Sequence, residues 1–213
     1  PETGFGVSMF DANQDGALDV AIGNGRVRKK PGGISYSGTG ILEQFHRDYA
    51  ESNRLMINMG NGKFADGCVV PSPFCTDLHV SRGLLTGDID ADGDLDIVVM
   101  NSNGPTRLYR NTIEDKGGWL KLRAFDPALK RDAIGARVRI RIGDTWQVRP
   151  VIHSDSYLSS HDAVAHFGMG SAIATDEIIV TWPRGDTERF PPLTRNQMAV
   201  LLKGQGVFIE AAK

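Results

Sequence analysis

A nine-residue acidic pattern occurs twice in the chain, and each copy runs directly into an apolar stretch. The two copies lie in MFDANQDGALDVAIGNG (residues 9–25) and TGDIDADGDLDIVVMNS (residues 86–102), and both read D-x-[DN]-x-D-G-x-L-D. A second similarity follows each copy, NRLMINMGNGKF after the first and TRLYRN after the second. An internal repeat of this kind predicts a repetitive architecture.

The crowded carboxylates of each acidic loop need a counter-charge, because close carboxylates repel each other by roughly 1 kcal/mol per pair in water. Oxygen ligands at positions 1, 3, 5 and 9 and a backbone carbonyl at position 7 suit a hard cation, and glycine at position 6 permits the sharp turn. Calcium is favoured over magnesium because a cage built mostly by protein suits the larger ion. The expected ligands are Asp11, Asn13, Asp15, Ala17 (carbonyl) and Asp19 in one site, and Asp88, Asp90, Asp92, Asp94 (carbonyl) and Asp96 in the other.

Two other interpretations of the acidic loops were weighed. A turn rich in Asx residues that holds no metal is one alternative, and it is harder to dismiss for the first loop, which has Asn13 and fewer carboxylates. An EF-hand is the other, but Ile22 or Val99 stands where its bidentate glutamate belongs. The short β-branched segments after each loop also predict strands where an EF-hand has a helix.

The composition favours a soluble all-β protein. The chain has 213 residues, 40% hydrophobic and 23% charged, with 25 glycines and a net charge of −2. This charge gives no reason to expect nucleic acid or an anionic membrane as a partner. No apolar run approaches the roughly 20 residues that span a bilayer.

The repeats resemble FG-GAP/VCBS repeats, the blades of integrin-α-type β-propellers. The acidic loops and the segments RLYRN and NMGNGKF carry the resemblance, which covers roughly residues 5 to 111. The two motifs are 77 residues apart, further than in a usual blade, and Arg26 to Ser52 is interpreted as an inserted loop.

The second half resembles the ASPIC/UnbV module, which follows FG-GAP repeats in secreted proteins similar to cartilage acidic protein. Arg131-Asp132, residues 134–137, and His166-Phe167-Gly168 with Gly170 carry this match, over about Trp119 to Gly204. The resemblance implies an extracellular or periplasmic, calcium-loaded binding protein without established catalytic activity.

The expected fold class is therefore all-β, with partial integrin-α-like propeller blades followed by a small β-sandwich or barrel-like domain. The expected domains are residues 1–111 with two calcium-loop blades, a linker at 112–118, and an ASPIC/UnbV-like domain at 119–213. ARVRIRIGDTWQVRPVI predicts a hairpin that turns at Gly143-Asp144, and EIIVTWP and MAVLLK predict further strands.

Cys68 and Cys75 are the two cysteines, with six residues between them. A disulfide is plausible in an oxidising compartment, and two unpaired thiols are the alternative. Arg137, Arg139 and Arg141 alternate with apolar residues, so one strand face is basic. Such a face could bind acidic polysaccharide or phosphate, although it is more often a solvated sheet face.

No catalytic site is expected. Ser154, Ser159, His161 and Asp162 are close in sequence, but a triad is recognised by its geometry and no nucleophile elbow is present. The favoured function is a non-enzymatic, calcium-binding extracytoplasmic module that binds a protein or a glycan. The alternatives are an accessory subunit of a larger cell-envelope complex and a calcium-dependent polysaccharide-degrading enzyme scaffold.

The number of repeats leads to a prediction about partners. A closed propeller needs about four to eight blades, and the chain carries two calcium motifs. We therefore expect either a portion of a longer repeat protein or a subunit completed by other polypeptide. The alternative is that the repeats pack directly on the ASPIC-like half as one compact β unit.

Overall fold

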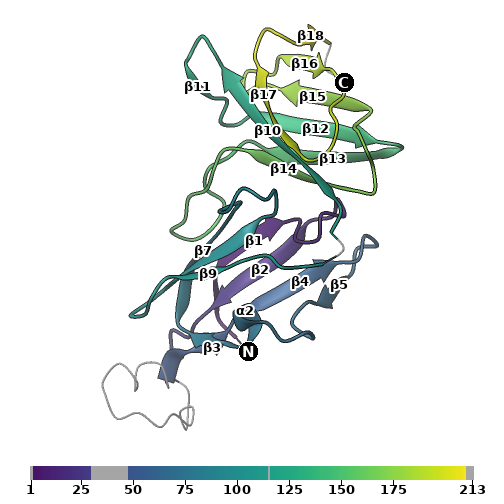
Figure 1. Ribbon diagram of the computed structural model, residues 1–213. Helices are drawn as coiled ribbons and strands as arrows, with labels where there is room; N and C mark the ends of the chain where they lie inside the picture. The colour runs from purple at the N-terminus through teal and green to yellow at the C-terminus, as the bar shows by residue number, and fades with distance from the viewer. Residues whose placement is uncertain (1, 30–47, 115, 210–213) are drawn as a thin grey trace.

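The computed structural model describes residues 2–29, 48–114 and 116–209. Figure 1 shows two lobes, one built from the strands before residue 110 and one from the strands after residue 117. The inserted loop predicted at Arg26 to Ser52 lies mostly outside the described residues. The expected all-β class is confirmed, since a four-residue helix, α2, is the longest helix in the described part of the chain.

The first lobe contains two antiparallel meanders and a small two-stranded sheet. One meander has the order β1-β2-β4-β5, the other has the order β7-β8-β9, and β3 pairs with β6. Its elements are β1 (Gly4–Phe10), β2 (Asp19–Asn24), β3 (Glu51–Ser52), β4 (Arg54–Asn58), β5 (Phe64–Asp66), α2 (Pro73–Thr76), β6 (Leu78–His79), β7 (Ser81–Gly87), β8 (Asp96–Asn101) and β9 (Arg107–Tyr109).

The two meanders pack against each other through their first strands, β1 and β7. A Cβ atom built on Gly6 of β1 would lie 2.6 Å from the backbone nitrogen of Leu84 in β7. Only glycine allows this approach of two backbones. Cys68 and Cys75 form a disulfide with a Cα–Cα distance of 5.5 Å, and Cys75 and Phe74 belong to the core of this lobe. The pairing left open by the sequence is thus present in the structure.

The second lobe is a sandwich of two sheets. In one sheet β10 lies between β14 and β17 and also pairs with β11, and the other has the order β13-β12-β15-β16-β18. Its strands are β10 (Gly118–Asp126), β11 (Arg131–Asp132), β12 (Arg137–Ile142), β13 (Thr145–Pro150), β14 (Ala165–Gly170), β15 (Glu177–Thr181), β16 (Thr187–Phe190), β17 (Gln197–Leu202) and β18 (Val207–Phe208).

The predicted strands of this lobe are confirmed. β12 and β13 form the expected hairpin, with Ile142 opposite Thr145, and β15 and β17 coincide with the other two predicted segments. Alternate residues of β10 face inward because side chains of a strand point to opposite faces in turn, and Leu120 and Leu122 are fully buried.

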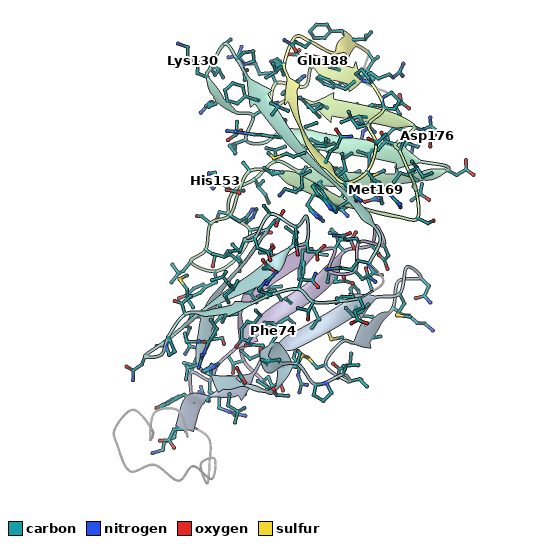
Figure 2. All side chains as sticks on the ribbon, viewed as in Figure 1. Phe74, Lys130, His153, Met169, Asp176 and Glu188 are labelled. Carbon is teal, nitrogen blue, oxygen red and sulfur yellow. A yellow bond between two sulfur atoms is a disulfide. The ribbon has the colours of Figure 1, made fainter. Side chains whose placement is uncertain are left out.

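Each lobe has its own hydrophobic core. Phe74 lies in the core of the first lobe and Met169 in that of the second, as Figure 2 shows. The described members of the first core end at Ile113, and those of the second begin at Leu120. Between these two cores, Gly117 donates a hydrogen bond to the carbonyl of Asn13 (3.2 Å).

Candidate metal centre

The two acidic loops close equivalent hairpins. Phe10 pairs with Asp19 at the end of the β1–β2 hairpin, and Gly87 pairs with Asp96 at the end of β7–β8. Each loop therefore spans the same number of residues between its paired strands. The repeat seen in the sequence is a repeat of structure.

The backbones of the two loops also match. The fourth residue of each loop has a positive φ, 59° at Gln14 and 62° at Ala91. The sixth residue is glycine in both, with φ of 97° at Gly16 and 96° at Gly93. This left-handed backbone favours glycine, which explains why Gly16 and Gly93 recur.

The carboxylate at position 1 of each loop accepts a hydrogen bond from the backbone nitrogen at position 6, which closes the turn. Asp11 Oδ2 accepts a hydrogen bond from Gly16 N (2.8 Å), and Asp88 Oδ2 accepts one from Gly93 N (3.0 Å). Burial raises the pKa of Asp11 to about 6, although the bond from Gly16 opposes the shift. The first loop thus holds a desolvated carboxyl group, and the charge of Arg149, which donates a hydrogen bond to the carbonyl of Gly16 (3.2 Å), opposes the shift only in part.

The ninth-position carboxylates connect each loop to the end of the third strand of its meander or to the residues just after it. Asp19 accepts hydrogen bonds from Ala12 N (2.8 Å) and Asn58 N (2.8 Å). Asp96 accepts the equivalent bonds from Ile89 N (3.2 Å) and from Asn111 N (2.8 Å). Burial also raises the pKa of Asp19.

Two asparagines of the site were missed at the level of the sequence. Asn58 donates from its side chain to the carbonyl of Leu18 (3.0 Å), within its own repeat. Asn111 donates to the carbonyl of Ala12 (2.7 Å), which belongs to the other repeat. The signal was present, since both asparagines end a shared R-L-x-x-N pattern, at residues 54–58 and 107–111.

The second loop brings three carboxylates together. Oxygen atoms of Asp88, Asp90 and Asp92 lie within 4.8 Å of one another. Asp11, Asp15 and Asp19 of the first loop do not form such a group, in part because position 3 there is Asn13. An asparagine oxygen could still ligate a cation, but it contributes no charge.

One oxygen in the second loop has no partner. Asp88 Oδ1 is buried and makes no hydrogen bond with any described residue, and the whole Asp88 side chain is 3% exposed. A buried acceptor without a donor is costly. It lies in the one loop where three carboxylates converge, so the residues present fit a cation that would engage this oxygen.

Basic side chains surround the second loop. Lys121 Nζ lies 2.5 Å from Asp88 Oδ2, Arg110 forms an ion pair with Asp90, and Lys116 forms one with Asp94. Lys121 comes from β10, so the second lobe supplies a cation to a loop of the first. These amines and the guanidinium partly offset the carboxylate repulsion in this structure.

The two loops also contact each other. The Gln14 side chain of the first loop donates to Asp94 Oδ1 of the second (2.5 Å). Gln14 is 1% exposed. The two candidate metal sites are therefore neighbours in space, although 77 residues separate them in sequence.

Strand β14 of the second lobe closes over both loops. His166 Nε2 lies 2.9 Å from the carbonyl of Gly93, and because a carbonyl only accepts, this nitrogen is the donor. Burial lowers the pKa of His166 to about 4, so the ring is neutral at pH 7. Gly170 N donates to the carbonyl of Gln14 (2.8 Å).

The residues singled out as a possible triad do not contact one another as a triad requires. Ser154 Oγ donates to the carbonyl of Ser159, and Ser159 Oγ donates to that of Tyr157. His161 Nε2 lies 3.2 Å from Asp155, not from a hydroxyl group.

Most of the second lobe is similar in sequence to a known protein family. Residues 126–207 match the family described as ASPIC and UnbV, and the residues that touch the acidic loops from β14 lie within this range. This part of an all-β chain is thus similar to the ASPIC and UnbV family.

The chain as a whole is similar to Cartilage acidic protein 1 of Xenopus tropicalis, with 27% identity over an alignment of 229 positions. The alignment covers 85% of this chain and 34% of the relative. The chain therefore spans about a third of the length of this curated relative. No described helix is long and apolar enough to cross a membrane.

Proposed function

We propose that this chain is a calcium-binding, non-enzymatic interaction module that works outside the cytoplasm. The observation that carries the calcium assignment is the second loop, where three carboxylates converge around the unpartnered Asp88 Oδ1. Oxygen-only ligands in a loop with a glycine turn favour calcium among the common divalent cations. Calcium would be held by the ten residues identified from the sequence, with water completing each shell.

The ion would replace the repulsion among carboxylates by attraction and so stiffen both loops. Because β14 and Lys121 of the second lobe contact these loops, this stiffening would extend to the junction between the lobes. We propose a structural role for calcium on this basis.

An extracytoplasmic location is supported by the Cys68–Cys75 disulfide, since disulfides persist in oxidising compartments. The relative is named after cartilage, an extracellular tissue matrix, and this is consistent with a location outside cells. We also propose that the two meanders are FG-GAP/VCBS blades, which further blades of a longer protein or a partner subunit would complete. The close packing of β1 against β7, the first strand of each meander, supports this proposal.

The calcium assignment is tested by isothermal titration of the chelator-treated protein with calcium chloride and, separately, magnesium chloride. We expect calcium uptake and a higher melting temperature in calcium than in chelator, because a ligand of the native state stabilises it by mass action. Asp88→Asn should weaken binding at the second loop. Asp144→Asn, which changes an exposed aspartate in a hairpin turn, is the matched control.

Two results would overturn the proposal. One is the absence of calcium uptake together with an unchanged melting temperature in chelator. The other is the release of reducing ends from a polysaccharide by the purified chain, which would establish an enzyme.

A further inference from the structure

The outer face of the five-stranded sheet in the second lobe is basic. Strand alternation and pairing place Arg137, Arg139 and Arg141 of β12 on the face opposite the buried Val138 and Ile140. We call this surface the arginine face. Its residues from β12, β13, β15 and β16 are Arg137, Arg139, Arg141, Trp146, Val148, Pro150, Glu177, Ile179, Thr181, Thr187 and Arg189.

An aromatic ring lies among these arginines. The guanidinium carbons of Arg139 and Arg141 lie 5.3 Å and 5.9 Å from the centre of the Trp146 ring. Trp146 is 41% exposed and its neighbour on the same face, Val148, is 44% exposed. The face thus combines positive charge with an apolar plane that solvent reaches.

Acidic side chains neutralise only part of this charge. Glu177 is the one acid among the outward residues of these four strands, and it is shared by Arg189 (2.5 Å) and Arg141 (3.5 Å). Among the described residues, no ion pair or hydrogen bond engages the guanidinium group of Arg137 or Arg139. Arg139 Nε is buried without a hydrogen-bond partner.

We propose that the arginine face binds a linear acidic polysaccharide through its carboxylate or sulfate groups. Guanidinium forks bind such oxyanions in a bidentate manner, and alternate residues of a strand repeat about every 6.6–6.8 Å. A row of arginines with this spacing suits an extended chain of repeated charges. The exposed Trp146 ring offers a flat apolar surface for the faces of sugar rings.

This inference rests on the proposed extracytoplasmic interaction role and names its ligand class. Nucleic acid is a weaker fit, because the disulfide indicates an oxidising compartment outside the cytoplasm. An anionic membrane is also a weaker fit, because the apolar part of the face is limited to a few side chains around Trp146.

The test measures binding of the full chain, in calcium buffer, to polygalacturonate and dextran sulfate, with neutral dextran as the blank. We expect binding to at least one polyanion that weakens steeply as salt rises, as polyanion contacts do. The double change Arg137→Gln/Arg139→Gln should lower affinity at least tenfold, and Trp146→Leu should lower it several-fold. Arg131→Gln, on an exposed residue of the other sheet, should change affinity less than twofold.

Each other outcome overturns the proposal. It fails if neither polyanion binds at low salt, or if Arg131→Gln weakens binding as much as the double change does. It also fails if single-stranded DNA or phosphatidylserine vesicles compete as well as the polysaccharides do. Calcium titration and the melting temperature of each variant are measured in parallel, so loss of glycan binding with intact calcium uptake rejects the arginine face alone.

Discussion

Gly168 of β14 lies so close to Asp11 of the first acidic loop that a Cβ atom built on the glycine would be 2.0 Å from Asp11 Oδ2. The same Cβ would lie 2.5 Å from backbone atoms of Gln14. Because Gly168 has no side chain, the first acidic loop can pack directly against β14 of the second lobe.

Gly168→Ala should destabilise the protein, because the added methyl group meets backbone atoms that cannot move aside. We expect a loss of about 1–3 kcal/mol of unfolding free energy, typical of overpacking, together with weaker calcium binding at the first loop. Urea unfolding checks the first effect and calorimetric titration the second. Gly87→Ala, whose Cβ would meet nothing closer than 3.7 Å, is the control. Equal stability of the two variants would contradict the close packing.

Lys121→Met should strengthen calcium binding at the second loop. The Lys121 amine lies 2.5 Å from Asp88 Oδ2 and competes with an ion for that carboxylate. We expect at least about a tenfold gain in affinity, since charges this close interact by more than 1 kcal/mol even in water. Lys63→Met, at an exposed lysine, is the control.

The same change should lower the melting temperature in chelator, because it leaves the carboxylate of Asp88 buried without its partner. Calcium should then raise the melting temperature of Lys121→Met by more than it raises that of the wild type. An unchanged calcium affinity would show that Lys121 does not compete for the site.

The pair formed by His161 and Asp155 should make stability depend on pH. The hydrogen bond with Asp155 raises the pKa of His161 above its usual 6.5. A raised histidine pKa stabilises the fold below the unfolded value, and this contribution is lost as pH rises through the folded value. The melting temperature difference between wild type and Asp155→Asn should therefore be larger at pH 5.5 than at pH 8.5. A melting-temperature difference between the two proteins that does not change with pH would contradict this role of the His161–Asp155 pair.

Removal of the disulfide by Cys68→Ser/Cys75→Ser should lower the unfolding free energy by about 2–3 kcal/mol, the order expected for a short closed loop. The bond ties the loop before α2 to the core of the first lobe through Cys75. Urea unfolding of the wild type with and without reductant gives the matched measurement. A stability that reductant leaves unchanged would argue against the bond in solution.

The sequence predicted the elements well because their signals are local. The repeated acidic pattern indicated two equivalent loops, and the alternation in β12 indicated a hairpin. The contacts of β14 with these loops could not be predicted, because His166 and Gly93 are 73 residues apart and only folding brings them together. Asn58 and Asn111 carried a repeated signal, but their bonds to the loops depend on strand pairing across each meander.

The parallel pairing of β10 with β17, from Leu120 opposite Gln197 to Phe125 opposite Leu202, has a consequence for the order of folding. The strand that opens the second lobe cannot gain this neighbour until almost the entire described chain has left the ribosome. Pairing across so long an interval is slow, because the chain loses entropy before the contact forms. During synthesis the first lobe can therefore fold before β17 pairs with β10. Until that pairing forms, this edge of β10 is exposed and accessible to a chaperone.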